Sequence, residues 1–214
     1  MILKIQQTKK ELFSAAFDIL HKEERVGTIS VSGKLGSMEA DIRVNVFGNI
    51  FTMKYAGGLF AEQKIKKGYK SYRKYSISDA TNDGGYIYQV DWQQKLFLTT
   101  SYHEMEYKGM RYNSYVVSLP AEGGRQSVYR EGVQVAQINI PGEVVNNLYN
   151  YTIYALDQKE AEMCAIICAY IYINAHFKPG EKAIKSYVKY YTTGTKDAFL
   201  LEKYNPDFVE TIEE

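Results

Sequence analysis

The sequence predicts a mainly β (α+β) protein, a closed antiparallel barrel built around a late hydrophobic helix. From residue 13 to residue 154, short segments rich in β-branched and aromatic residues alternate with turn residues, and no helical segment separates them. The run from Glu160 to Phe177 has helical composition and is apolar on almost every side. The chain also carries 20 tyrosines against 4 prolines, which favours strands.

Length and charge set the general class of protein. The 214 residues suit one domain that can bury a sizeable core, and the formal net charge is +1. Because no global field attracts polyanions, nucleic acid is not an expected partner, and any anionic partner needs a local patch. The opening MILKIQQTKKELF has charges where a signal peptide needs an apolar core, so we expect a cytoplasmic protein.

The predicted strands follow one another at short spacing. Most show the period-two alternation of a half-buried strand, and double glycines at residues 57–58, 84–85 and 123–124 indicate turns. Regular spacing of this kind is typical of an antiparallel sandwich or barrel. In order, the segments are AAFDIL, VGTISVSG, DIRVNVFG, NIFTMKY, YIYQVDW, KLFLTTSY, NSYVVSL, QSVYR, VQVAQINI and YNYTIYAL.

The helix that follows has a marked beginning and end. Asp157 and Glu160 have the spacing of a capping box, and Pro179 with Gly180 ends the run. No charged residue lies between Met163 and Ile173, so the helix has no polar face. A membrane span needs about 20 apolar residues, and this run is shorter. We therefore expect a buried helix, with a closed sheet supplying apolar cover on all sides.

The last part of the chain predicts little regular structure. In residues 182–214, Thr195 or Asp197 can cap a short helix that ends at Asn205 and Pro206. The final DFVETIEE is acidic, and we expect it to fray.

Catalytic and metal-binding patterns are weak. Cys164 and Cys168 stack on one helix face and could ligate a metal, but no second ligand pair has zinc spacing, so we expect core packing. His21, His103 and His176 belong to no recognisable catalytic constellation. We therefore expect no catalytic residue, no metal, no cofactor and no enzyme activity.

One basic run is the candidate binding site. EQKIKKGYKSYRKYSI interleaves lysines and an arginine with three tyrosines. Such a patch can attract anionic lipid headgroups, and the same composition can serve single-stranded nucleic acid or simply form a solvated edge strand. The candidate residues are Lys64, Lys66, Lys67, Lys70, Arg73 and Lys74.

Four features of the chain together resemble the tubby C-terminal-like superfamily. They are the glycine-spaced hairpins, the segments SVYREGVQVAQI and YTIYAL, and the acidic-capped helix DQKEAEMCAIICAYIYI. That group includes the tubby proteins, the phospholipid scramblases and the plant LURP-one-related proteins. The resemblance covers about residues 13–177 and implies a barrel of twelve strands around a central helix. It also implies binding of phosphoinositide headgroups by basic residues on the barrel wall. Scramblase-like calcium binding is not expected, because the chain has no EF-hand-type acidic loop.

These observations predict that residues 1–178 form the barrel together with its central helix. Residues 179–214 form an extension that the resemblance does not include, and it packs on the barrel or mediates self-association. We expect a non-catalytic binding module that reaches anionic phospholipid or phosphoinositide headgroups at the membrane periphery. The alternative is an interaction scaffold or homodimer acting through the extension.

Overall fold

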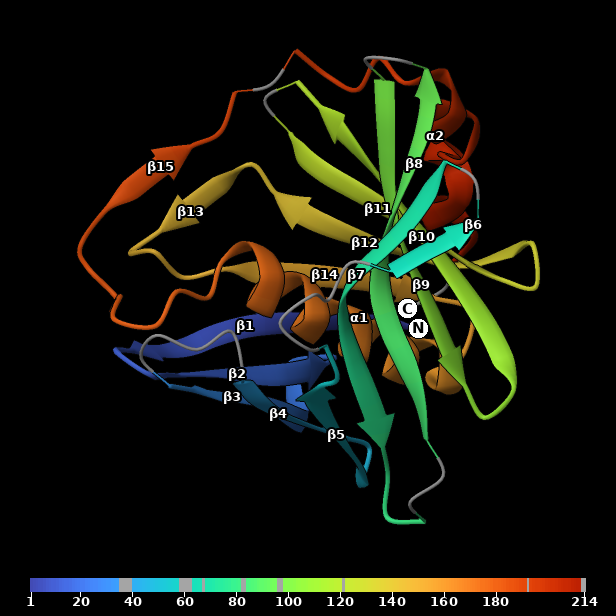
Figure 1. Cartoon of the computed structure of the whole chain (residues 1–214). Coiled ribbons are helices and arrows are strands. Elements are labelled where there is room, and N and C mark those ends of the chain that lie inside the picture. The colour runs from blue at the N-terminus through green and yellow to red at the C-terminus, as the bar shows by residue number, and fades with distance from the viewer. Residues whose placement is uncertain are drawn as a thin grey trace.

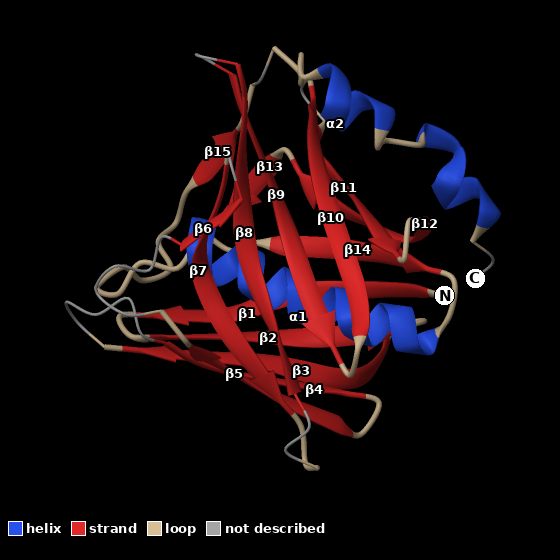
Figure 2. Cartoon of the chain, turned by 45° about the vertical axis from the view of Figure 1, so that its right-hand side comes forward, coloured by secondary structure: helices blue, strands red, loops and turns tan. Residues whose placement is uncertain are grey.

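The fold is a closed antiparallel barrel of twelve strands with a helix inside it (Figures 1 and 2). The computed structural model describes residues 1–34, 40–57, 63–66, 68–81, 84–95, 98–120, 122–191 and 193–212. The strands of the main sheet are β1 (Ile2–Glu11), β2 (Ser14–His21), β3 (Glu24–Gly33), β4 (Ala40–Val46), β5 (Asn49–Tyr55), β6 (Gln63–Lys66), β7 (Tyr69–Ser78), β8 (Gly84–Lys95), β9 (Leu98–Tyr107), β10 (Met110–Leu119), β11 (Gly123–Arg130), β12 (Val133–Pro141) and β14 (Asn150–Ala155).

Pairing of β5 with the second half of β7 closes the barrel. Around the ring, the order is β5-β4-β3-β2-β1-β14-β12-β11-β10-β9-β8-β7, and all pairs are antiparallel. The short strand β6 pairs with the first half of β7 and lies outside this ring. Beyond the β5–β7 pairing, β7, β8 and β9 therefore continue without closure, and we call residues 69–72, 89–95 and 98–103 the open part of the barrel.

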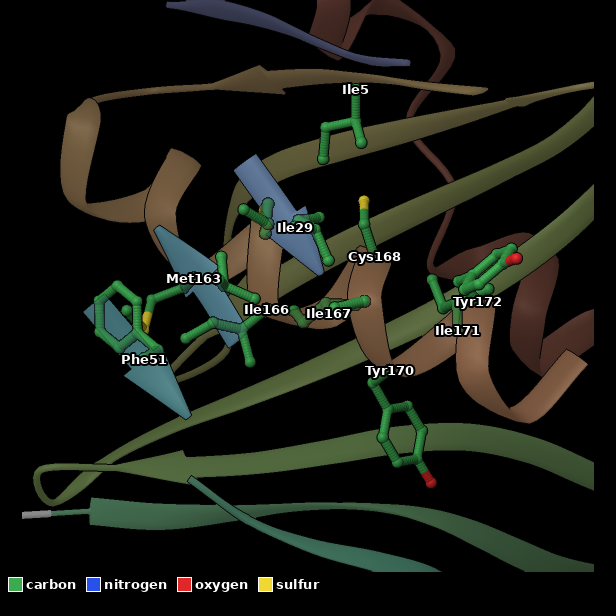
Figure 3. Packing of buried hydrophobic residues seen from close by; sticks show 14 of the residues in the cluster. Ile5, Ile29, Phe51, Met163, Ile166, Ile167, Cys168, Tyr170, Ile171 and Tyr172 are labelled. Atoms are coloured by element: carbon green, nitrogen blue, oxygen red, sulfur yellow. The ribbon is translucent and has the colours of Figure 1, made fainter. Parts of the chain in front are cut away.

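The helix α1 (Gln158–Ala175) runs through the closed part of the barrel, as expected from its composition. Every residue from Glu160 to Ile173 is buried, and its isoleucines pack among strand side chains such as Ile5 and Ile29 (Figure 3). The helix begins and ends two residues before the predicted bounds of 160 and 177. A ring of strands removes water from every face, so an apolar surface on all sides is stabilising here.

Half of the predicted capping box is present. The side chain of Asp157 accepts a hydrogen bond from the backbone N–H of Glu160 at 2.9 Å. The carboxylate of Glu160 binds the guanidinium of Arg130 on β11, where the capping box would direct it back to Asp157. The carboxylate is buried, and a cation from the barrel wall compensates its charge.

The extension packs on the barrel instead of projecting away from it. After α1 the chain bonds to the β1–β2 hairpin, pairs as β15 (Tyr187–Lys189) with β13 (Glu143–Val145), and continues into α2 (Ala198–Glu202) and the 3-10 helix η1 (Pro206–Thr211). Figure 2 shows α2 and η1 outside β10, β11 and β12. Asp197 caps α2. The expectation that residues 207–214 fray is wrong for η1, because Phe208 is buried against the barrel wall.

Candidate functional site

The structure places the residues of the predicted basic patch in different environments. Lys64 and Lys66 lie on β6, where Lys64 pairs with Lys70 of β7, and Lys70 is exposed. Lys67 lies outside the described residues. Lys74 places its ammonium 3.7 Å from the ring centroid of Tyr86 on the neighbouring strand β8, a cation–π contact.

Arg73 has an internal role. A bulge between β7 and β8 gives it a φ of 55°, and its Nη1 donates to the carbonyl of Asn174 in the last turn of α1 at 3.1 Å. The hydroxyl of Tyr170 donates in return to the carbonyl of Arg73 at 2.9 Å. Arg73 thus satisfies a free carbonyl at the helix C-terminus, where a cation also complements the helix dipole.

Burial favours the uncharged form of both thiols and of two imidazoles. Cys164 and Cys168 are fully buried in α1, and burial raises the pKa of both thiols. Burial lowers the pKa of His103 and of His176 to about 4. Within the described residues, no group of three or more His, Cys, Asp or Glu side chains could hold a metal ion.

A groove on the outer wall of the barrel is a second candidate site, which the sequence did not reveal. This outer groove crosses strands β1 to β5 and has a volume of ≈ 590 Å³. Among the described residues that line it, three are cations and one is a carboxylate, and four carry small hydroxyl side chains. Its polar side chains are Lys9, Arg43, Lys54, Asp41, Ser14, Ser30, Ser32 and Thr52.

Strand register brings these residues together in two rows. Ser14, Ser32, Asp41 and Lys54 are successive cross-strand partners, and Ser30, Arg43 and Thr52 form the next row. Lys9 pairs with Glu11 at 2.9 Å. Arg43 and Lys54 form no salt bridge within the described part of the chain, so both cations are open to a ligand from solvent. Guanidinium, ammonium and hydroxyl donors together suit an anionic oxygen, as in a phosphate or carboxylate group.

Next to the outer groove, the end of the barrel at the C-terminus of α1 carries most of the large apolar or aromatic side chains that are exposed in the described residues. The tip of the β1–β2 hairpin exposes Leu12 and Phe13 by 47% and 40%. The extension joins this tip, because the N–H of Gly180 donates to the carbonyl of Leu12 and that of Ala183 to Lys10. Of the thirteen large apolar or aromatic side chains exposed in the described residues, eight lie here. We call them the aromatic end: Leu12, Phe13, Val145, Ile184, Tyr187, Val188, Tyr190 and Tyr191.

Lysines accompany these side chains. Lys182 and Lys185 are exposed and form no salt bridge among the described residues, whereas Lys189 binds Glu143 at 3.0 Å. In Figure 1, β13 and β15 project together on the left, on the same side as the turn between β1 and β2. The aromatic end therefore combines apolar surface with positive charge at one edge of the molecule.

Sequence reasoning missed both features for different reasons. The groove residues come from five strands and become neighbours only through register. The aromatic end had a visible signal, the run KAIKSYVKYY, but nothing in the sequence tied it to the Leu12–Phe13 turn.

Comparison with protein-family models, with curated proteins and with solved structures finds no match to this chain. None of the helices in the described residues is long and apolar enough to cross a membrane. The class that the structure defines is a closed twelve-stranded antiparallel barrel with a helix inside it.

Proposed function

We propose that the protein is a non-catalytic module that docks peripherally on anionic phospholipid surfaces, with the aromatic end at the interface. The observation that carries this proposal is the gathering of eight of thirteen exposed large apolar side chains at one end, beside lysines that lack a carboxylate partner among the described residues. Monomeric proteins usually scatter such side chains, and a gathered apolar patch with a polar rim is typical of an interaction site.

The chemistry of the aromatic end suits a bilayer interface. Tyrosine rings favour the headgroup level, where the ring packs against lipid and the hydroxyl stays hydrated. Each lysine near an anionic surface contributes about 1 kcal/mol of attraction. Leu12 and Phe13 form the outermost turn of a hairpin, so they can enter the acyl boundary without rearrangement of the barrel.

The outer groove would take the phosphate-bearing headgroup. It begins beside the hairpin tip, because Ser14 follows Phe13 directly and Lys9 lies on the other strand of the hairpin. A headgroup phosphate held by Arg43 and Lys54 would then sit next to the inserted tip. This arrangement agrees with the resemblance to tubby-like barrels, which implies headgroup binding on the barrel wall. We propose that the protein is cytoplasmic and reaches the membrane reversibly.

The second candidate is self-association through the same surface. In the two-stranded sheet, β15 pairs with β13 on one edge, and no described strand pairs with its other edge, where a second copy could add. A homodimer formed in this way would cover Tyr187 and Val188.

Co-sedimentation with vesicles tests the proposal. We expect binding to phosphatidylcholine vesicles that contain phosphatidylserine or a phosphoinositide, no binding to phosphatidylcholine alone, and weaker binding as salt increases. Two variants, L12S/F13S and K182E/K185E, should each abolish binding while thermal unfolding stays unchanged. K64E/K66E makes the same charge change on β6 and serves as the matched control.

Three outcomes would overturn the proposal. Binding that survives L12S/F13S but is lost in K64E/K66E would move the site to the originally predicted patch. No binding to any vesicle, together with a dimeric mass in light scattering that Tyr187→Lys makes monomeric, would favour self-association. A monomer that binds no vesicle would leave neither candidate standing.

A further inference from the structure

The open part of the barrel is polar on its inner face. His103 identifies the inner face, because its ring contacts Tyr170 of α1, the helix inside the barrel, with the ring centroids 5.4 Å apart. Gln89 is the cross-strand partner of His103, and Asp91, two residues further along β8, faces the same side. Seven described inner positions are wholly or partly exposed: Lys70, Tyr72, Gln89, Asp91, Gln93, Thr99 and Ser101.

Part of the outer face of the same strands is buried. Val90 and Thr100 alternate with the inner residues and are 0% and 1% exposed. Thr100 donates to Asp197, and the ring of Trp92 packs against Phe199, so the extension covers this face. The concave side of the open part, which elsewhere in the barrel holds the core, is thus left to solvent as a polar cup.

We propose that this polar cup binds a small, neutral, polyhydroxylated ligand such as a sugar or cyclitol, with Asp91 as its central acceptor. The cup contains a cavity of ≈ 400 Å³, within the range of small-molecule pockets. Its lining is Gly68, Tyr69, Lys70, Asp91, Gln93 and Thr99.

Asp91 is held in place by one of its two oxygens. Its Oδ1 accepts hydrogen bonds from Ser101 Oγ at 2.6 Å, from Tyr72 Oη at 3.2 Å and from Gln89 Nε2 at 3.3 Å. Its Oδ2 accepts none from the described residues. A carboxylate fixed at one oxygen and open at the other is a preorganised acceptor, which lowers the entropy cost of binding a hydroxyl donor.

The hydrogen-bond network continues inward from the cup through neutral groups. Gln126 Nε2 donates to Ser114 Oγ at 2.6 Å and lies 3.2 Å from His103 Nδ1. Gln126 is fully buried, and its Oε1 has no partner among the described residues. Because His103 resists protonation in this setting, the floor of the cup adds no charge at neutral pH.

The balance of charge and donors selects the ligand class. Among the described residues that line the cavity, Lys70 is the one cation and Asp91 the one carboxylate, and the nearby Arg73 binds Asn174 of α1. The remaining amide and hydroxyl groups, such as Gln93 and Thr99, both donate and accept. A neutral polyol matches this mixture, since each hydroxyl also donates and accepts, whereas an anion would face Asp91.

Heteronuclear NMR titration of the full chain tests the proposal. The probes are glucose, galactose, myo-inositol and sorbitol at millimolar concentrations. At least one should cause saturable shifts of the amide signals of Thr99, Ser101 and Gln93, while Ser30 and Ser32 of the outer groove stay unmoved. Asp91→Asn should weaken the apparent affinity by at least about tenfold, because it loses the carboxylate acceptor.

The matched control is Asp41→Asn, the same change in the outer groove, which should bind the probe like the wild type. Ser101→Ala keeps the carboxylate but removes the shortest of the bonds that hold it, and should weaken binding less than Asp91→Asn. Absence of saturable shifts with all four probes would overturn the proposal. Equal affinity in Asp91→Asn would do the same, as would ethanolamine binding in place of every polyol, since that would show an ammonium site.

Discussion

The closed and open parts of the barrel bury opposite faces of their strands. In the closed part, inner side chains such as Ile42 and Val44 are buried and apolar, while Arg43 between them faces water. In the open part, Asp91 faces the interior and meets water, while Val90 faces outward and is buried. The difference shows that alternation sets two faces, and that what covers each face decides which one is core.

Different segments of the chain cover the strands in the closed and in the open part of the barrel. The helix α1 fills the closed part and excludes water from the inside. Past the C-terminus of α1 nothing comparable fills the barrel within the described residues, and the extension packs on the outside instead. The comparison therefore predicts where a substitution is costly and where it is harmless.

The largest effect is expected inside the closed part. Ile166→Ala should lower the free energy of unfolding by about 3 to 4 kcal/mol, because it leaves a cavity between the helix and the wall. Ile50→Ala, at a half-exposed position on β5, is the matched control and should cost less than about 1 kcal/mol. Urea unfolding measures both, and equal losses would contradict a dry closed interior.

Acid should destabilise the region where the two parts meet. Burial is the main cause that lowers the pKa of His103 and of His176 to about 4, and the nearby charges of Arg73 and Lys10 add to it. The unfolded chain therefore binds more protons than the folded chain between pH 6.5 and 4, and stability falls as pH falls through this window. The loss is on the order of 2 kcal/mol per histidine at pH 5.

Urea unfolding between pH 7.5 and 4.5 measures this dependence. His103→Gln and His176→Gln should each flatten it, and comparison of the variants at pH 7.5 separates lost packing from lost titration. An unchanged pH profile in His103→Gln would mean that water reaches the floor of the polar cup and hydrates the charged ring.

A smaller loss is expected on the outer face of the open part. Phe199→Ala removes ring contacts with Trp92 and Tyr115, at centroid distances of 5.1 and 5.6 Å, and should cost about 1 to 2 kcal/mol. Because Trp92 is the only tryptophan, its fluorescence should shift to the red. Leu201→Ala in the same helix changes an exposed side chain and is the control. A red shift in the control alone would contradict the packing described.

The smallest effect is expected on the inner face of the open part. Gln93→Ala should change the free energy of unfolding by less than about 0.5 kcal/mol, because the side chain is exposed although it faces the barrel interior. A loss comparable to that of Ile166→Ala would show that the open part is a packed core after all.

Much of the fold follows from local sequence signals. Alternating segments predicted the strands, and the apolar run with Asp157 before it predicted a buried, capped helix. The sidedness of the open part was not predictable, because it depends on Phe199 reaching Trp92 across more than a hundred residues. A bulge turns Arg73 away from the predicted basic patch. The sequence gives no sign of this bulge, because the residue with the positive φ is Arg73 itself and not a glycine.

The predicted basic patch stays a prediction, and the outer groove is a candidate site that only the structure revealed. The sequence indicated binding through clustered cations, yet the cations that the structure leaves open in the outer groove are Arg43 and Lys54. These two residues lie on neighbouring strands and are brought together only by the pairing of β4 with β5. Clustering along the chain favoured residues 64–74 because it ignores such cross-strand neighbours.

The most direct test of membrane docking places a fluorescent probe at the aromatic end. In Phe13→Trp, we expect quenching by brominated lipid in anionic vesicles and none in neutral vesicles, beyond the signal of Trp92 in the wild type. Val133→Trp is the control, since Val133 is exposed at the other barrel end, near Arg130 and its partner Glu160. Quenching at position 13 alone would support docking through the aromatic end. Vesicle binding with equal or no quenching at the two positions would contradict it.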